Sequence, residues 1–296
     1  MQYYNLDTAD TGLVVEIDGT VYDLGTADDP VNTFRELAKA AAVSGTSIDR
    51  IGTRLSQSAE TLSPAVLEES LDRPITPDEV WAAGVTYEIS ETAREAESDR
   101  PDVYMDVYDS ERPELFFKST ASRTVGDGAA VGIREDSTWD VPEPELGIVL
   151  FRGEIVGYTV GNDMSSRSIE GENPLYLPQA KVYDRCCAIG PGVTSAEAVS
   201  DPHDLRMEMH IERNGDLLYE DSTTTANMKR SCEELVSYFC RHNAVPELAV
   251  LLTGTSLVPE DDFTLAEGDT ISIDIDDLGQ IKNSVRSEER RVGKEC

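Results

Sequence analysis

The feature that most limits the possible fold is a repeated pair of strand-length segments joined by a tight turn. Two of the joints are Asp18-Gly19 and Asn214-Gly215, dipeptides that readily adopt the backbone of a hairpin turn. Apolar and β-branched residues are frequent in the flanking segments, as expected of strands. The pairs are residues 13–17 with 20–24, 145–151 with 155–160, and 205–212 with 217–220. The sequence therefore predicts a fold rich in β-hairpins.

Helical periodicity is present in two places. Residues 31–44 and 227–242 each carry apolar side chains spaced along one face of a helix. Short strands are predicted again at 249–252 and 270–275. Because helices do not alternate regularly with strands, a dinucleotide-binding fold is disfavoured, and we predict an α+β, sheet-dominated protein.

Two prolines in residues 74–77 mark the expected boundary between regions, at the end of a mixed connector that begins at residue 45. We predict a small N-terminal region, 1–77, and a catalytic region, 78–285. The last segment, 286–296, is net positive in a very acidic chain and resembles the translation of a sequencing adapter. We expect it to be a non-native tail.

The charge of the chain excludes one large class of function. Asp and Glu number 58 against 25 Lys and Arg, which gives a net charge of −33. Nucleic-acid phosphates would be repelled, so we expect no nucleic-acid partner. Such self-repulsion is tolerable where salt shortens the Debye length to about 3 Å, as at 1 M. The composition indicates a salt-adapted organism, in which most carboxylates are solvated surface groups.

Targeting and cysteine signals are both weak. No run of about 18 apolar residues is present, and the first residues lack a basic flank and an apolar core for secretion, so we expect a cytoplasmic protein without membrane contact. The five cysteines show no zinc-type spacing. We interpret the adjacent Cys186 and Cys187 as small core residues.

The sharpest chemical signal is the segment Glu143-Pro144-Glu145. Two carboxylates separated by one residue in an extended segment point the same way and can share a cation. Asp163 ends the partner strand of the same predicted hairpin, which returns a third carboxylate to the first two. Three hard oxygen ligands favour Mg²⁺ or Mn²⁺ over zinc. The alternative is an ordinary solvated acidic surface.

A series of motifs gives this site a context, because in order they resemble the fumarylacetoacetate hydrolase family. They lie at residues 81–87, 116–119, 142–146, 157–163, 190–191, 251–255 and 279–285. The resemblance implies a β-rich catalytic fold, a metal on Glu143, Glu145 and Asp163, and a homodimer or homotetramer. It further implies that Lys181, Arg167 and Thr255 line the substrate site.

Within this family the chain departs from the hydrolases. Their water-activating histidine corresponds here to Ser90, in the stretch 86–90, and the three histidines of the chain lie outside every motif. Residues 171–183 instead resemble the branch that dehydrates 2-keto-3-deoxypentonates, derived from arabinonate or xylonate, to 2,5-dioxopentanoate. We therefore expect a small 2-keto acid substrate and a metal-dependent hydro-lyase reaction.

Individual roles follow from this expectation. Lys181 is the candidate proton-transfer residue, with a pKa lowered by burial beside a metal, or else it only binds the substrate carboxylate. Arg167 would orient the acid and Thr255 would donate a hydrogen bond to it. Further pocket residues are expected at Tyr87, Ser90 and Lys118. The acidic Glu114 and Glu172 are possible proton carriers, although surface positions are favoured for both.

Three alternatives remain open from the sequence. An acylpyruvate hydrolase or an oxaloacetate decarboxylase of the same family would share the metal ligands, and only the departure near Ser90 and the segment 171–183 separate them from a dehydratase. A non-catalytic metal-binding protein is the third, and the presence of Lys181 beside all three carboxylates argues against it.

Overall fold

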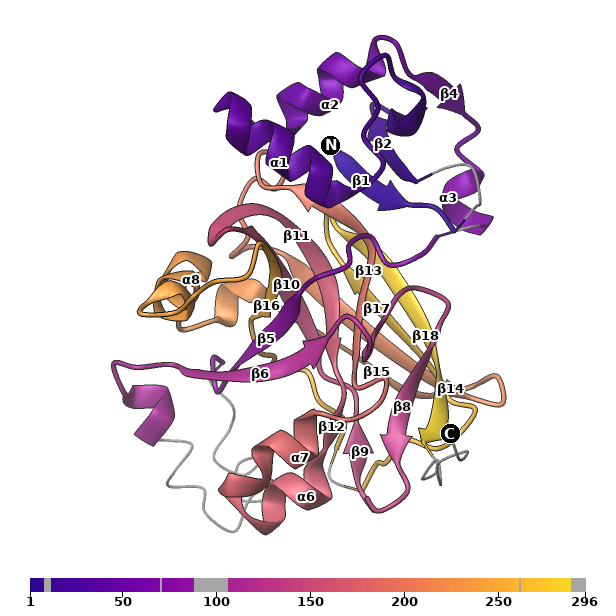
Figure 1. Ribbon diagram of the computed structural model, residues 1–296. Coiled ribbons are helices and arrows are strands. Elements are labelled where there is room, and N and C mark those ends of the chain that lie inside the picture. The colour runs from indigo at the N-terminus through magenta and orange to yellow at the C-terminus, as the bar shows by residue number, and fades with distance from the viewer. Residues whose placement is uncertain (8–11, 70, 88–105, 261, 289–296) are drawn as a thin grey trace, which may run out of the picture.

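Two β-sheets make up most of the protein in a computed structural model that describes residues 1–7, 12–69, 71–87, 106–260 and 262–288 (Figure 1). In the larger sheet the order is β4-β3-β2-β1-β13-β11-β10-β16-β5-β6, with β7 paired to β13. The smaller sheet has the order β15-β14-β17-β18-β8, and β9 pairs with β12. This is the predicted α+β, β-rich plan.

The first half of the described chain contains these elements: β1 Gln2–Asn5, β2 Leu13–Ile17, β3 Thr20–Asp23, α1 Phe34–Ser44, α2 Ile48–Ser56, β4 Glu60–Leu62, α3 Val66–Glu69, β5 Glu79–Gly84, β6 Glu114–Thr120, β7 Thr124–Val125, β8 Ala130–Arg134 and β9 Asp140–Val141. The second half contains β10 Pro144–Phe151, β11 Glu154–Asp163, β12 Ser165–Ser166, α6 Arg167–Glu172, α7 Leu177–Lys181, β13 Cys187–Ser195, β14 Arg206–Arg213, β15 Asp216–Thr224, α8 Cys232–Cys240, β16 Leu248–Leu252, β17 Thr270–Ile275 and β18 Gly279–Glu288.

The N-terminal region forms the predicted hairpin and helix. Strands β2 and β3 pair across the Asp18-Gly19 turn. Helix α1 starts later than predicted because Thr33 caps it, with Glu36 completing a reciprocal capping box. Helix α2, inside the segment interpreted as a mixed connector, was missed. Strand β1 pairs with β13, so this region extends the sheet of the catalytic region.

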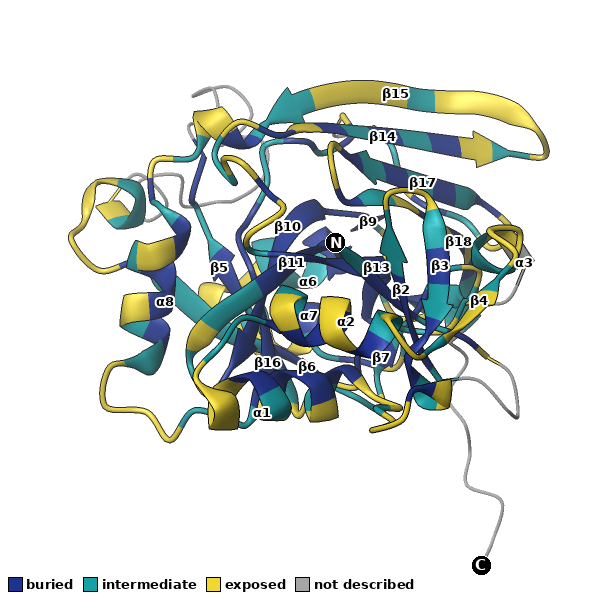
Figure 2. Ribbon diagram, turned by 90° about the horizontal axis from the view of Figure 1, so that it is seen from above, coloured by how far each residue is buried: buried dark blue, intermediate teal, exposed yellow. Residues whose placement is uncertain are grey.

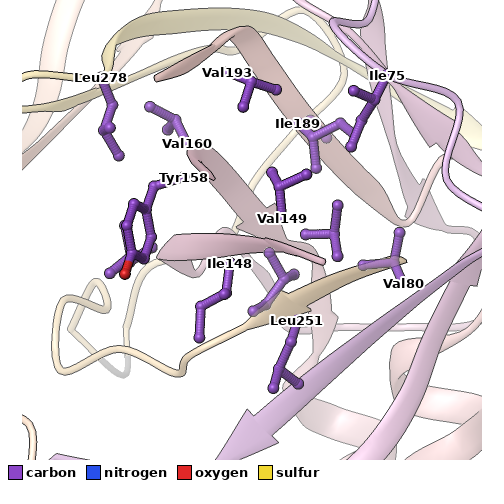
Figure 3. Close-up of a cluster of buried hydrophobic side chains, with 14 of the residues drawn as sticks. Ile75, Val80, Ile148, Val149, Tyr158, Val160, Ile189, Val193, Leu251 and Leu278 are labelled. Carbon is purple, nitrogen blue, oxygen red and sulfur yellow. The ribbon is translucent and has the colours of Figure 1, made fainter. Parts of the chain in front are cut away.

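The centre of the larger sheet is apolar on both faces. Strands β10, β13 and β16 are buried along their whole length. Figure 3 shows Ile148, Val149, Val160, Ile189 and Leu251 packed together from adjacent strands of this sheet. Burying these side chains removes enough apolar surface to hold the ends of β10 and β11 rigidly in place.

The C-terminal half matches most of the predicted elements. Strand β17 covers the predicted residues, and β14 pairs with β15 across Asn214-Gly215. Helix α8 begins later than expected because Ser231 caps it, which leaves Met228 outside the helix. Figure 2 shows that β15 forms a largely exposed edge.

Strand β18 continues into the segment expected to be a non-native tail. Arg286, Ser287 and Glu288 pair with Gly132, Ile133 and Arg134 of β8, respectively. The expected boundary at residue 286 therefore falls inside a strand, while 289–296 lie outside the described residues. Within the described part of the chain, no helix combines the length and the apolar character needed to span a bilayer.

Candidate metal centre and active site

The three predicted ligands come from one hairpin. Glu143 directly precedes β10, Glu145 is the second residue of β10, and Asp163 is the last residue of β11. The two strands are antiparallel and Glu145 lies opposite Gly161, so the start of one strand meets the end of the other. All three carboxylates are buried, with one oxygen of each within 4.8 Å of the others. The structure thus brings together the three residues that the sequence singled out.

Cationic side chains surround two of these carboxylates. Lys181 Nζ donates to Glu143 Oε2 at 2.8 Å and lies 3.4 Å from Asp163 Oδ2. Arg167 Nη2 is 2.9 Å from Glu143 Oε1, and Lys118 Nζ is 2.5 Å from Asp163 Oδ1. Burial alone would raise the pKa of Glu143, but Lys181 and Arg167 outweigh burial and hold that pKa below its usual value. Glu143 is therefore held in its ionised form.

Glu145, unlike Glu143, has no cationic side chain paired with its carboxylate among the described residues. Its Oε2 accepts a hydrogen bond from the backbone N–H of Gly254 at 2.7 Å, and no described lysine or arginine forms an ion pair with it. Burial raises the pKa of Glu145 well above its usual value, and repulsion from Asp163 and Glu143 raises it further. A cation bound here would relieve both effects. Three buried carboxylates, one of them without a cationic partner, are a donor set that fits Mg²⁺ or Mn²⁺.

Lys181 ends α7 and points into the carboxylate cluster, where Nζ also donates to Ser165 Oγ at 2.6 Å. Burial lowers the pKa of Lys181, but the carboxylates of Asp163, Glu143 and Glu170 outweigh burial and raise it above its usual value. The lowering expected for this group beside a bound metal stays a prediction. The ammonium group is a proton donor in this arrangement.

Lys118 was expected to face the substrate, and the structure places it behind the metal site instead. Its side chain is fully buried, and Nζ donates to the backbone oxygens of Met164 at 2.7 Å and Lys181 at 2.5 Å. Together with the ion pair to Asp163, these bonds tie β6 to β11 and α7. Lys118 therefore positions Asp163 and does not line the pocket.

A pocket opens in front of the carboxylates. Arg167, Lys181 and Thr255 line it, as the family resemblance implied, and Phe116 and Leu177 add apolar walls. The combination of charged groups and apolar walls suits a small acid with a carbon chain.

The remaining predicted pocket residues differ in their placement. Tyr87 is buried and forms an isolated β-bridge with Met228, and its hydroxyl has no hydrogen-bond partner among the described residues. Burial, and then the charge of Glu145, raise the pKa of Tyr87. Ser90 lies outside the described residues. Glu172 is exposed on α6, which agrees with the surface position favoured for it.

Glu114 is the site residue that was undervalued from the sequence. It begins β6, lies opposite Gly84 of β5, and lines the pocket with Phe116 of the same strand. Burial, followed by repulsion from Glu170, raises the pKa of Glu114 to about 7. The available signal was its place two residues before Phe116, because alternate strand residues share a face. A carboxyl group in this state can accept or donate a proton near neutral pH.

No histidine contributes to the pocket. The chain has three, and the structure describes all of them. His203 accepts a hydrogen bond from the backbone N–H of Cys232, while His210 pairs with Glu220 on the exposed sheet edge. His242 lies in the loop after α8, with φ of 57°. An imidazole that activates water is therefore absent from the chain's own side chains around the metal site.

Known proteins resemble this chain over nearly its whole length. A protein from Haloferax volcanii named "Probable 2-keto-3-deoxyxylonate dehydratase" is 59% identical over 286 residues, covering 96% of this chain and 99% of the relative. The 2-dehydro-3-deoxy-D-arabinonate dehydratase of Saccharolobus solfataricus is 38% identical, covering 88% and 87% respectively.

A solved structure extends the comparison to three dimensions. The structure of 2-keto-3-deoxy-D-arabinonate dehydratase complexed with magnesium and 2,5-dioxopentanoate matches with a TM-score of 0.83 at 31% identity, over 98% of this chain and 100% of that chain. The family described as fumarylacetoacetate (FAA) hydrolase C-terminal matches residues 79–286, which include all three carboxylate ligands. The chain therefore belongs to the fumarylacetoacetate hydrolase family.

Proposed function

We propose that this protein is a magnesium-dependent hydro-lyase that converts a 2-keto-3-deoxypentonate to 2,5-dioxopentanoate and water. The observation that carries the proposal is the placement of Glu114, with a pKa of about 7, in the same pocket as three buried carboxylates that fit a divalent ion. The two dehydratase relatives and the solved complex support the same reaction.

The substrate binds with its acid end toward the carboxylate cluster and the cationic side chains around it. When bound there, Mg²⁺ would withdraw electrons from the 2-keto group and so make the C3 protons acidic. Arg167, which lines the pocket beside Glu143, attracts and orients the substrate carboxylate. Phe116 and Leu177 exclude water from the carbon chain.

Glu114 and Lys181 then divide the proton transfers. The ionised Glu114 carboxylate takes a proton from C3, and the electron pair left behind expels the C4 hydroxyl, which leaves as water after gaining a proton. Lys181, held protonated by its carboxylate neighbours, donates toward that departing oxygen. A double bond forms between C3 and C4, and transfer of one proton from C5 to C3 followed by rearrangement of the enol gives the C5 aldehyde. The product therefore contains the atoms of the substrate less one water.

The 2-keto-3-deoxy acids named after xylonate and arabinonate differ less than their names suggest. A 2-keto-3-deoxypentonate retains one stereocentre, C4, because C2 carries the keto group and C3 carries two hydrogens. Acids derived from xylonate and arabinonate of the same series are therefore one compound. The choice that the pocket makes is between the two C4 enantiomers, and the S. solfataricus relative and the solved complex, both named for D-arabinonate, favour the D form.

Hydrolysis of acylpyruvates is the rival reaction within the family. It requires activation of water, and none of the three histidines of the chain is placed to do this.

The proposal also includes a cytoplasmic, salt-adapted enzyme that acts as a homodimer or homotetramer. The charge of −33 supports the salt adaptation.

The deciding experiment is an assay of the purified protein with Mg²⁺ in about 2 M potassium chloride, where surface charge is well screened. Both enantiomers of 2-keto-3-deoxypentonate, an acylpyruvate and oxaloacetate are supplied in parallel. We expect 2,5-dioxopentanoate from one enantiomer, detected by NMR, and negligible cleavage of the other acids. Faster acylpyruvate hydrolysis or oxaloacetate decarboxylation than dehydration would refute the proposal.

A further inference from the structure

Gly84 and Glu114 are direct cross-strand partners. Gly84 ends β5, Glu114 begins β6, and the two residues lie opposite each other in the antiparallel pairing of these strands. Both line the catalytic pocket. Side chains of directly opposed residues project from the same face of a sheet, within about 5 Å of each other. A side chain at position 84 would therefore share its space with that of Glu114.

The carboxylate of Glu114 occupies the place that a side chain on Gly84 would need. A Cβ on Gly84 would lie 2.0 Å from Glu114 Oε2, 2.9 Å from Cδ and 3.5 Å from Cγ. The first two distances are too short for any real contact. Within the described residues, no hydrogen bond of 3.5 Å or less and no ion pair of 4.0 Å or less fixes this carboxylate. Its position is therefore set largely by the space left open above Gly84.

Other pocket and sheet glycines are required for a different reason. A Cβ on Gly254 would meet Thr86 Oγ1 at 2.2 Å and the backbone oxygen of Ala83 at 2.8 Å, and its φ of +81° is itself unfavourable for other residues. A Cβ on Gly157 would meet the backbone oxygen of Thr194 at 2.6 Å. Those glycines are needed by the fold. At Gly84 all three nearest atoms belong to one flexible side chain, and its φ is not positive.

We infer that Gly84 is a positioning residue for the proton-accepting carboxylate: the absence of a side chain at this point lets Glu114 fold over β5 and reach the substrate. The inference rests on the proposed function, in which Glu114 takes the C3 proton. It predicts that even one methyl group at position 84 displaces the carboxylate while the sheet still forms, because Glu114 can rotate away toward solvent.

The test is Gly84→Ala, measured by two readouts. The first is turnover of the 2-keto-3-deoxypentonate. The second is deuterium uptake from D₂O at C3 of 2-oxopentanoate, which lacks the C4 hydroxyl and so reports proton abstraction alone. We expect both rates to fall by about 10²-fold, the scale of a misplaced reacting group. The Michaelis constant, Mg²⁺ affinity and melting temperature should change little, because neither ligands nor backbone are altered.

Leu115→Val is the matched control. Leu115 is the next residue of β6 and faces the opposite side of the sheet, near Trp81 and Phe239. It should leave both rates close to those of the wild type. A similar loss in Leu115→Val and Gly84→Ala would mean that general disturbance of β6 explains the effect, and would overturn the inference.

A double variant separates a steric role from a structural one. In Glu114→Asp the carboxyl carbon stands where Cγ of Glu114 stands, 3.5 Å from the added Cβ, and rotation about the Cβ–Cγ bond can turn both oxygens away from the added methyl group. Adding Gly84→Ala to Glu114→Asp should therefore cost much less than the loss of about 10²-fold expected in the wild type. An equal cost in both backgrounds, or misfolding in both, would overturn the inference.

The outcomes also separate the inference from the proposed function. Wild-type protein that neither dehydrates the pentonate nor exchanges C3 would refute the proposed function together with the inference. Active wild-type protein with a Gly84→Ala variant within about twofold of it would refute the inference alone.

Discussion

Replacing Glu145 by glutamine should stabilise the protein without metal and abolish its stabilisation by metal. Glu145 is buried beside two other carboxylates within 4.8 Å and accepts one hydrogen bond, from Gly254. A glutamine side-chain oxygen can accept the same bond while carrying no charge. The substitution therefore removes repulsion without removing a favourable contact, which is unusual for a buried residue.

The gain in unfolding free energy expected for Glu145→Gln has an upper limit, which is set by the free energy of protonating Glu145. Two unit charges 4.8 Å apart repel by about 3.5 kcal/mol at an effective dielectric constant of about 20, so two neighbours would cost about 7 kcal/mol. Binding a proton at Glu145 would relieve this cost, in keeping with a pKa that burial and the two neighbouring carboxylates raise well above its usual value. At pH about 7, some 2.5 units above the ordinary pKa of 4.5, protonation costs about 3.4 kcal/mol. We expect Glu145→Gln to raise the unfolding free energy by about 1 to 3 kcal/mol, below that ceiling.

The pH dependence of stability is a second test of whether Glu145→Gln stabilises the protein. Because folding raises the pKa of Glu145, its contribution to wild-type stability is fully present below pH 4.5 and is lost as the pH rises above that value. The advantage of Glu145→Gln should therefore be small near pH 4.5 and grow toward neutrality. Mg²⁺ at about 100 times its dissociation constant should add about 2.7 kcal/mol to the wild type and little to the variant.

Urea unfolding in about 2 M potassium chloride, with chelator or with Mg²⁺, measures both effects. Glu143→Gln is the matched control, since Glu143 is paired with Lys181 and Arg167. Its loss leaves buried cations uncompensated and should lower stability by about 3 to 5 kcal/mol. The reasoning would be refuted if Glu145→Gln destabilised the chelated protein, or if Mg²⁺ stabilised the variant as much as the wild type.

Three further predictions follow from the same structure. Glu114→Gln should lower turnover by about 10² or more, with Mg²⁺ affinity retained. In the wild type, kcat/KM should fall as the pH drops below about 7, because a protonated Glu114 cannot accept the C3 proton. A flat profile of kcat/KM from pH 5 to 8 would contradict this role. Raising potassium chloride from about 0.1 M to 2 M should raise the melting temperature, since screening weakens repulsion among the 58 acidic groups, and an unchanged melting temperature would contradict that explanation. Deleting residues 289–296 should leave the melting temperature unchanged. Deleting residues 286–296 also removes the pairing of three residues with β8 and should lower the melting temperature. Equal melting temperatures for the two deletions would show that this pairing adds nothing to the stability of the protein.

The metal ligands could be found from the sequence because their signal is local. Glu143 and Glu145 alternate in an extended segment, and a short hairpin brings Asp163 back to them. The local signal of Glu114, its place two residues before Phe116, is weaker, since it is one carboxylate among 58 and becomes a pocket residue only through the pairing of β5 with β6. Its raised pKa depends first on burial in the folded pocket and then on Glu170, which comes from α6, far along the chain.

The place of Lys118 in the structure differs from the expected pocket position for a related reason. It follows Phe116 in the same strand by two residues, so regular alternation would place it beside Phe116 in the pocket. The pairing of β5 with β6 shifts its register between Val80 and Trp81, next to Lys118. Its ammonium group instead lies behind Asp163. Helix α2 gives only a weak signal in the sequence, because it is short, its polar face dominates, and one serine, Ser47, caps it.

The pairing of β1 with β13 has a consequence for how the chain is made. Gln2 lies opposite Thr194, so the first strand synthesised waits for nearly two hundred residues before its neighbour leaves the ribosome. Until then one edge of β1 is open, and an open edge can recruit strands of other nascent chains. Expressed alone, residues 1–77 would keep that edge permanently and should aggregate. Supplying the remaining chain in trans should suppress this aggregation, because β13 can then cover the edge.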